Sequence, residues 1–318
     1  MCEIPPPRPP PAKLNPDEKQ QAREKLAREC TFKPRTAELQ AEGCDPANAF
    51  ESYEQDPHTM EVRDARLLPQ DADILLPSSA GLTVVSHVSS ITDWLNEELL
   101  ASTYYDEVFA VLRKLTGAEH IFLGGPHVSR REGSADARAQ PLYHLHNDYT
   151  GNMKEAYMCA LSSEEPNQSW TMEEMLAMSF VDGGDVPAQM KAVGLTAERL
   201  AERRMVVLNT WRNTSDEPVG RCPLAVADQR TIKSGDGCGG VVGRLGLTRR
   251  EGQQFYYYPG LTREELLVFI GYDSDAKEHA PCVHSAFEDM NAPTDAPPRR
   301  SIELRCILVM PPASQHVA

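Results

Sequence analysis

Short runs of β-favouring residues, each bounded by turn residues, recur along the second half of the chain. The runs are rich in β-branched and aromatic side chains and cover Met205–Trp211, Phe255–Tyr258, Leu266–Tyr272 and Ile302–Met310. Two further strands are predicted upstream, at His120–Leu123 and at Leu142–Tyr149, where apolar and polar residues alternate. The concentration of strands in the second half predicts a β-sandwich or barrel. No internal repeat of fixed period is present.

Two stretches carry helical spacing instead. Between Ser89 and Thr116 the apolar residues recur at near-helical intervals, with an interruption around Ser102–Tyr105, which predicts two successive amphipathic helices that support a sheet. Met172–Arg203 carries several short helical patterns separated by glycines, and we expect this block to cover a site. The sequence thus predicts a mainly β core with flanking helices.

The beginning of the chain differs from the rest in composition. A proline-rich leader precedes Asn15, a helix N-cap candidate, and Pro16, which suits the first helical position, so a peripheral helix is expected there. We therefore divide the chain into residues 1–50, the leader and peripheral helix, and residues 51–318, a single domain with a helical insert at about 153–203.

The charge balance bears on the class of ligand. Against 47 Asp and Glu there are 32 Lys and Arg, and the acidic excess is spread along the chain instead of lying in one tail. Nucleic-acid binding depends on a concentrated basic surface, so we expect no nucleic-acid partner. A small-molecule substrate fits better, and a homodimer remains an option.

Cysteine usage and hydrophobicity bear on the compartment. The cysteines are scattered, with no CxxC pair, and are expected to be reduced thiols: Cys2, Cys30, Cys44, Cys159, Cys222, Cys238, Cys282 and Cys306. No stretch has the roughly 18 apolar residues that a membrane span needs. We expect a cytoplasmic protein without a membrane partner.

Candidate metal ligands appear in the segment Tyr143–Thr150. His146 and Asp148 are two residues apart, so on a strand their side chains project from one face. Two histidines and one carboxylate around one side of a metal suit iron(II) oxygenases, because the open side admits 2-oxoglutarate and oxygen. His284 lies between two β-rich segments and is the best candidate for the third ligand.

A candidate carboxylate anchor follows His284. Arg299 and Ser301 share one face if their segment is extended, while Arg300 points away. An arginine fork with a hydroxyl can hold a carboxylate bidentately, as the distal carboxylate of 2-oxoglutarate requires. The alternative interpretation is a solvated turn before a strand.

The order of these motifs resembles the CmcJ/AsaB-type family of iron and 2-oxoglutarate oxygenases, over roughly residues 85–310. The motifs, after the His-x-Asp element, are Asn209–Arg212, Pro223–Ala225, Asp228, Phe255–Pro259, Asp273–Ser274, His284–Phe287 and Arg299–Arg305. The family is similar to hydroxylases and desaturases of specialised metabolism in fungi and bacteria. The resemblance implies a double-stranded β-helix, or jelly roll, with iron(II), 2-oxoglutarate and O2, the ligands His146, Asp148 and His284, and Arg299 as anchor.

Several neighbours are candidates for cofactor or substrate binding. His144 is expected either to be a pocket residue or to have only a packing role. With His146 and Asp148 it also spells the HxHxD that opens two-metal hydrolase sites. Arg212 is a candidate partner for a carboxylate inside the barrel, or else an ion-pair residue. Tyr257 is a candidate substrate contact on condition that its side chain faces inward. Arg305 shares a strand face with Arg299, Ser301 and Glu303, and is expected either to line the pocket as a substrate contact or to pair with Glu303. A metal-dependent hydrolase and a non-catalytic β-barrel binding protein remain the alternatives to an oxygenase.

Overall fold

The computed structural model describes most of the second unit of the chain. The chain divides into Met1–Glu54 and Gln55–Ala318, and every described residue belongs to the latter. The described residues are 61–69, 73–136, 139–143, 145–149, 153–162, 186–233, 237–238, 245–247, 250–276, 283–289 and 291–312. The predicted leader and the helix expected from Asn15 lie outside them.

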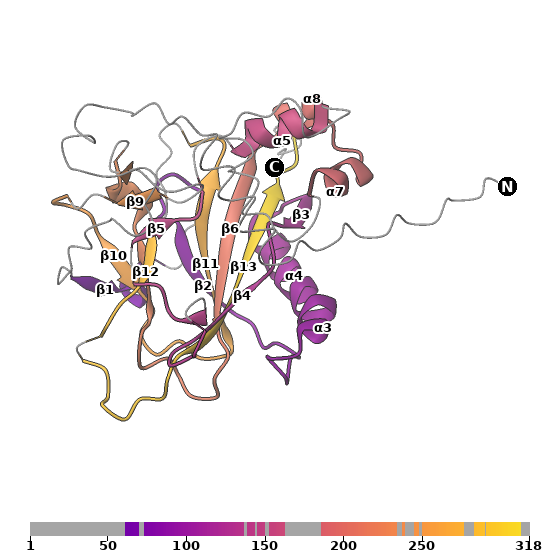
Figure 1. The fold of residues 1–318 in the computed structure, drawn as a ribbon. Helices are drawn as coiled ribbons and strands as arrows, with labels where there is room; N and C mark the ends of the chain where they lie inside the picture. Colours follow the sequence, from indigo (N-terminus) through magenta and orange to yellow (C-terminus); the bar gives the residue numbers. More distant parts are fainter. Residues whose placement is uncertain are drawn as a thin grey trace, which may run out of the picture. The chain divides into compact units, whose positions relative to one another are not determined.

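Strands outnumber helices among the described elements (Figure 1). The strands are β1 (Val62–Asp64), β2 (Leu82–Ser86), β3 (His120–Leu123), β4 (Val128–Arg131), β5 (His146–Asn147), β6 (Met205–Asn213), β7 (Leu224–Ala227), β8 (Gly237–Cys238), β9 (Leu245–Leu247), β10 (Phe255–Tyr257), β11 (Glu265–Asp273), β12 (His284–Ala286) and β13 (Arg300–Val309). The helices are η2 (Ala65–Leu67), α3 (Glu97–Leu99), η3 (Leu100–Tyr104), α4 (Tyr105–Thr116), α5 (Met153–Ser162), α7 (Val186–Ala192), α8 (Ala197–Ala201) and η5 (Gln229–Thr231).

The strands form two sheets that face each other. One has the order β1-β10-β7-β12-β5-β9-β8, and the other β2-β11-β6-β13-β3 with β4 beside β13. The inner faces meet where the Phe269 ring of β11 lies 4.9 Å, between centroids, from the His284 ring of β12. This arrangement, with helices outside the sheets in Figure 1, confirms the predicted mainly β, jelly-roll core with flanking helices.

Strand β13 shows how one strand serves both faces of its sheet. Ile302, Leu304, Cys306 and Leu308 belong to the same buried apolar cluster as residues of α4. Because successive side chains of a strand point to opposite faces, Ser301, Glu303 and Arg305 point the other way, towards the facing sheet. All three are buried, so a line of polar side chains runs between the two sheets.

The helix α4 packs on the outer face of the six-stranded sheet. Val108 and Leu112, one turn apart, are fully buried in the cluster that contains Leu304 and Leu308. The helix ends at Gly117, whose positive φ of 71° is the left-handed conformation that glycine adopts without strain. The expected break between two helices is instead the π-helical η3, which joins α3 and α4 continuously, and the helical region begins at Glu97 rather than near Ser89.

A second group of helices covers the inner face at the far end of β13. Tyr157 of α5, Met190 of α7 and Leu200 of α8 are buried with Ile307 and Val309. Figure 1 shows α5 and α8 beside the ends of β6 and β13. The part of the predicted helical block between residues 172 and 185 lies outside the described residues.

The predicted strands of the second half are confirmed by β6, β10, β11 and β13. The strand predicted over Leu142–Tyr149 is mostly wrong, because only His146–Asn147 joins a sheet. The backbone before it makes irregular contacts instead, as where the carbonyl of Leu142 accepts from the Ala286 N–H at 2.8 Å.

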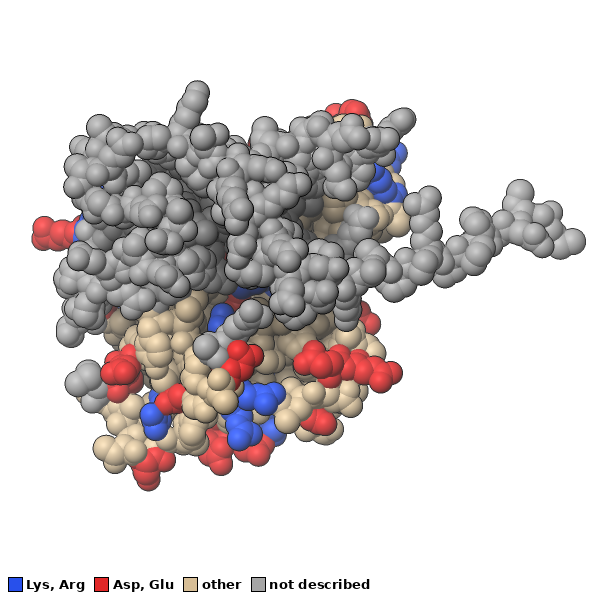
Figure 2. Space-filling view, viewed as in Figure 1, with Lys and Arg blue, Asp and Glu red and all other residues tan. Residues whose placement is uncertain are grey.

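Charges of both signs are intermixed over the described residues of the face in Figure 2. Among the described helices, none combines the length and the hydrophobicity that a bilayer crossing requires.

Candidate metal centre

Three side chains with ligating atoms converge between the sheets. His146 on β5 stands directly opposite His284 on β12, and the ring centroids are 4.4 Å apart. Oδ1 of Asp148 lies 3.8 Å from Nε2 of His146, and its Oδ2 lies 3.7 Å from Nε2 of His284. All three residues are buried. The pairing of β5 with β12 thus brings His284 beside two residues that lie far from it in the sequence.

The donor set fits a ferrous ion. One ligating atom from each residue lies within 4.8 Å of the other two. With metal–ligand bonds of about 2.1 Å, one ion can join donors up to about 4.2 Å apart, so the two histidine–carboxylate separations already suit a shared ion. Two imidazoles and one carboxylate on one side of a metal leave the opposite side open, which is the arrangement of non-haem iron(II) oxygenases.

Asp148 is held by two neighbours. Arg305 donates from Nε to Oδ2 at 3.1 Å and from Nη2 to Oδ1 at 3.2 Å, while Asn209 donates from Nδ2 to Oδ2 at 3.0 Å. Burial alone lowers the pKa of Arg305, but Asp148 and Glu303 raise that pKa above its usual range, so the guanidinium stays charged. Such partners fix the orientation of a ligand carboxylate.

Arg299 lies at the start of β13 with its guanidinium enclosed. Its Nε donates to Oγ of Ser301 at 3.1 Å, its Nη1 donates to the carbonyl of Cys222 at 2.8 Å, and its guanidinium lies 5.0 Å from the centre of the Trp211 ring. Burial lowers the pKa of Arg299 to about 10. Among the described residues no carboxylate forms an ion pair with it, so the site suits an external carboxylate.

Arg212 does not join this site, which corrects the expectation of a cofactor contact. It pairs with Ile302 across the sheet, and so points to the helical side while Trp211 points inward. Its guanidinium donates to Oη of Tyr104 at 3.1 Å and to the carbonyls of His87 and Arg263. These bonds connect β6 to η3 and to the backbone at His87 and Arg263, so the role of Arg212 is structural.

Of the two remaining candidates, Tyr257 is not brought to the triad by the described structure. Tyr256 pairs with Val226, which pairs with His284, so these three side chains share one face of the sheet. Tyr257 therefore points to the other face, where its ring packs edge-on against Phe287 with centroids 5.1 Å apart. His144 lies outside the described residues.

The fold and this donor set can be compared with known proteins. A family model for the Oxidoreductase/YMDC permease-like domain matches residues 28–172 and 185–309. The chain belongs to this family.

Two of the relatives with curated names are dioxygenases. The chain is 25% identical over 279 residues to the Fe(II)/2-oxoglutarate-dependent dioxygenase nvfI of Aspergillus novofumigatus, covering 83% of this chain and 87% of that protein. It is 24% identical over 241 residues to the alpha-ketoglutarate-dependent dioxygenase phiK of a fungal species, covering 72% and 77%. The solved structure of the iron and alpha-ketoglutarate-dependent endoperoxidase NvfI superposes with a TM-score of 0.60 at 26% identity, over 80% of this chain and 86% of that one. The predicted kinship with iron and 2-oxoglutarate oxygenases is confirmed.

The support for Asp148 includes residues to which sequence reasoning gave no role. Tyr149 donates from Oη to Oδ1 of Asn209 at 3.2 Å, and Asn209 in turn holds Asp148. A Cβ atom at Gly271 would lie 2.5 Å from the ring of Tyr149, so only glycine leaves room for this tyrosine. The available signal was a polar Asn209 inside the apolar run of β6, since a buried amide needs partners.

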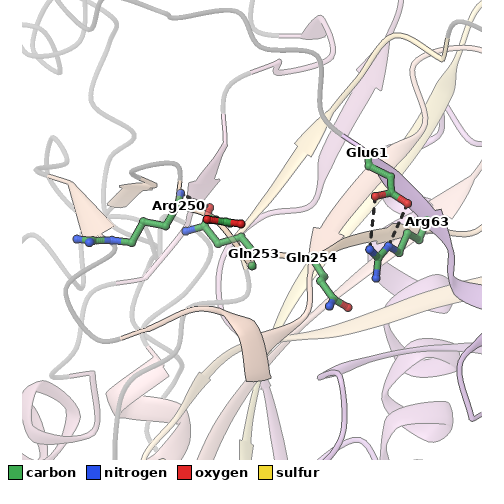
Figure 3. A pocket seen from close by; sticks show the side chains of 7 residues that line it. Glu61, Arg63, Arg250, Gln253 and Gln254 are labelled. Carbon is green, nitrogen blue, oxygen red and sulfur yellow. Dashed lines mark hydrogen bonds and ion pairs between the residues drawn. The ribbon is translucent and has the colours of Figure 1, made fainter.

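A separate pocket lies at the edge strand β1 (Figure 3). It has a volume of about 490 Å³ and includes the ion pair between Arg63 and Glu61, whose Nε and Oε1 are 3.3 Å apart. Its lining contains none of the residues predicted for the site and consists of Glu61, Arg63, Arg250, Glu251, Gly252, Gln253 and Gln254. In this family member the surface pocket and the metal centre are therefore distinct.

Proposed function

We propose that the chain is an iron(II)- and 2-oxoglutarate-dependent dioxygenase that oxidises a small-molecule intermediate of specialised metabolism. The observation that carries the proposal is the buried meeting of two imidazoles and one carboxylate, His146, His284 and Asp148. The relatives that bear the names of iron and 2-oxoglutarate dioxygenases support it.

Each residue of the proposed site has a separate task. His146, Asp148 and His284 would hold the iron, and Arg305 and Asn209 keep the carboxylate of Asp148 turned towards it. When bound, iron(II) with 2-oxoglutarate and O2 supplies oxidising power that no side chain has, with succinate and CO2 as co-products.

The anchor for 2-oxoglutarate is proposed to be Arg299 with Ser301. The guanidinium is buried, and Ser301 and the carbonyl of Cys222 fix its direction. A carboxylate in this place would compensate the buried charge through paired, charge-assisted hydrogen bonds. The guanidinium of Arg212 is equally buried, but its donors are taken by Oη of Tyr104 and the carbonyls of His87 and Arg263, so we do not propose it as an anchor.

The rest of the protein orients the substrate and keeps water away. A site between two sheets, with helices over one end of the inner face, lowers the entropy cost of positioning a C–H bond and protects a reactive centre. Hydroxylation, desaturation and cyclisation all use the same ligand set. We propose residues 51–318 as the oxygenase domain, with the insert at about 153–203 as a cover for the chamber.

The cellular setting is also a proposal. Cys159, Cys222 and Cys306 are free thiols, which supports a reducing compartment and hence the cytoplasm. The scattered charge supports a small molecule rather than a nucleic acid as the partner.

One spectroscopic experiment tests the proposed function. Anaerobic addition of iron(II) and 2-oxoglutarate should produce a weak visible charge-transfer band that His146→Ala removes. His120→Ala, which deletes an imidazole outside the triad, is the matched control and should retain the band. A hydrolase or a non-catalytic binding protein would give no band in any variant, and that result contradicts the proposal.

A further inference from the structure

The carboxylate of Asp148 lies against a buried positive charge. Both of its oxygens accept hydrogen bonds from Arg305, at 3.1 and 3.2 Å. A guanidinium so close offsets the charge that the carboxylate presents to a dication, and the effect is strong where water is excluded. Attraction for a metal ion therefore calls for another negative charge nearby.

Glu303 is placed to supply that charge. It is two residues from Arg305 on the same face of β13, and its Oε1 lies 3.3 Å from Nη2 of Arg305. Glu303 is only 7% exposed, and this Oε1 accepts no hydrogen bond from the described residues. A buried carboxylate oxygen without such a bond lowers stability, so hydrogen bonding at Oε1 does not explain the position of this side chain.

We infer that Glu303 sets the net charge of the metal centre by acting through Arg305. This inference rests on the proposed function. Asp148 and Glu303 share one guanidinium, so the three side chains together keep one negative charge. Glu303 is thus a positioning residue. Its negative charge raises the affinity of the site for the ferrous ion and lowers the affinity for 2-oxoglutarate, which is a dianion.

The variant Glu303→Gln separates charge from shape, because the two side chains are nearly equal in size. Cobalt(II), an air-stable substitute for iron(II), is titrated first, and 2-oxoglutarate is then titrated at saturating cobalt. We expect the affinity for cobalt(II) to fall about 10- to 100-fold, the range for partners of metal ligands. The affinity for 2-oxoglutarate should rise, because the site becomes more positive. Opposite changes for a cation and an anion are the signature of charge.

Two further variants complete the test. Glu265→Gln makes the same change on β11, where Glu265 pairs with Arg66 at 2.8 Å, and both affinities should stay as in the unmodified protein. Glu303→Asp keeps the charge and should retain most of the cobalt affinity. The inference is overturned if Glu303→Gln weakens both ligands, if it changes neither, or if Glu303→Asp binds cobalt as weakly as Glu303→Gln. Failure of the unmodified protein to bind cobalt(II) and 2-oxoglutarate contradicts the proposed function instead.

Discussion

Asn209 donates a hydrogen bond of 3.0 Å to Oδ2 of Asp148 from the strand that faces it. Its own Oδ1 accepts from Oη of Tyr149 at 3.2 Å, so both polar atoms of the amide are engaged. The amide cannot turn over without losing both bonds, and this fixes which part of the carboxylate faces the two histidines. Asn209 thereby connects β6 to a ligand that directly follows β5 of the opposite sheet.

Replacing Asn209 should weaken metal binding. Asn209→Ala is expected to lower the affinity for iron(II) about 10- to 100-fold, because the carboxylate of Asp148 loses its orientation. Anaerobic titration of the metal measures this. Asn213→Ala is the control, since Asn213 on the same strand donates to the carbonyls of Glu217 and Leu261 instead. Equal metal affinities in the two variants would contradict a role for Asn209 at the site.

Arg299 should govern the affinity for 2-oxoglutarate without affecting the metal. Arg299→Gln is expected to cost about 2–5 kcal/mol of 2-oxoglutarate binding, as for the loss of one partner of a buried charge pair. The charge-transfer band, titrated with 2-oxoglutarate at saturating iron(II), gives this value. Arg300→Gln alters the exposed neighbour on the opposite face and should change nothing. A similar loss in both variants would mean that general charge, and not the enclosed fork, attracts the ligand.

Arg212 should behave as a structural arginine. Arg212→Lys keeps the charge but cannot reach Tyr104 and two backbone carbonyls at once, so we expect a loss of about 1–3 kcal/mol in the free energy of unfolding. Urea denaturation measures the loss. The affinity for 2-oxoglutarate at saturating iron(II) should remain that of the unmodified chain, and a fall comparable to that of Arg299→Gln would return Arg212 to the list of anchors.

The contrast between these two arginines marks the limit of prediction from the sequence. A strand whose two faces differ in polarity reveals which side chains face inward, but all nine residues of β6 are buried. Nothing in the pattern therefore distinguishes the face of Arg212 from that of Trp211. Tyr257 posed the same problem, since it stands beside Tyr256 and Tyr258 and three consecutive tyrosines show no difference in polarity between the faces; Tyr256 is buried and Tyr257 only half-buried.

The triad was predictable because its signals are local or chemically rare. His146 and Asp148 are separated by the strand period, and His284 is a histidine between two β-rich segments, where strand pairing with His146 could be expected and is found. The support around Asp148 was not predictable. It depends on the register that places Arg305 opposite Asn209, and registers between distant strands are set by packing of the whole sheet.

The direction of the Arg299 guanidinium depends on an unusual backbone conformation at Cys222. Cys222 has a φ of 49°, in the left-handed region that residues other than glycine rarely adopt. This conformation turns its carbonyl to the Nη1 of Arg299 at 2.8 Å, while its Sγ lies 2.7 Å from Oη of Tyr143. Strain of this kind costs of order 1–3 kcal/mol and is retained where the surroundings require it.

Substitutions at Cys222 can separate the role of the carbonyl from that of the thiol. Glycine adopts a positive φ without strain, so Cys222→Gly should keep the carbonyl in place and retain the affinity for 2-oxoglutarate. A β-branched residue is strongly disfavoured there, so Cys222→Val should displace the carbonyl and weaken 2-oxoglutarate binding while iron(II) binding is unchanged. Titration of both ligands checks the pair. If Cys222→Gly loses as much 2-oxoglutarate affinity as Cys222→Val, the thiol and its contact with Tyr143 direct Arg299, and the backbone conformation does not.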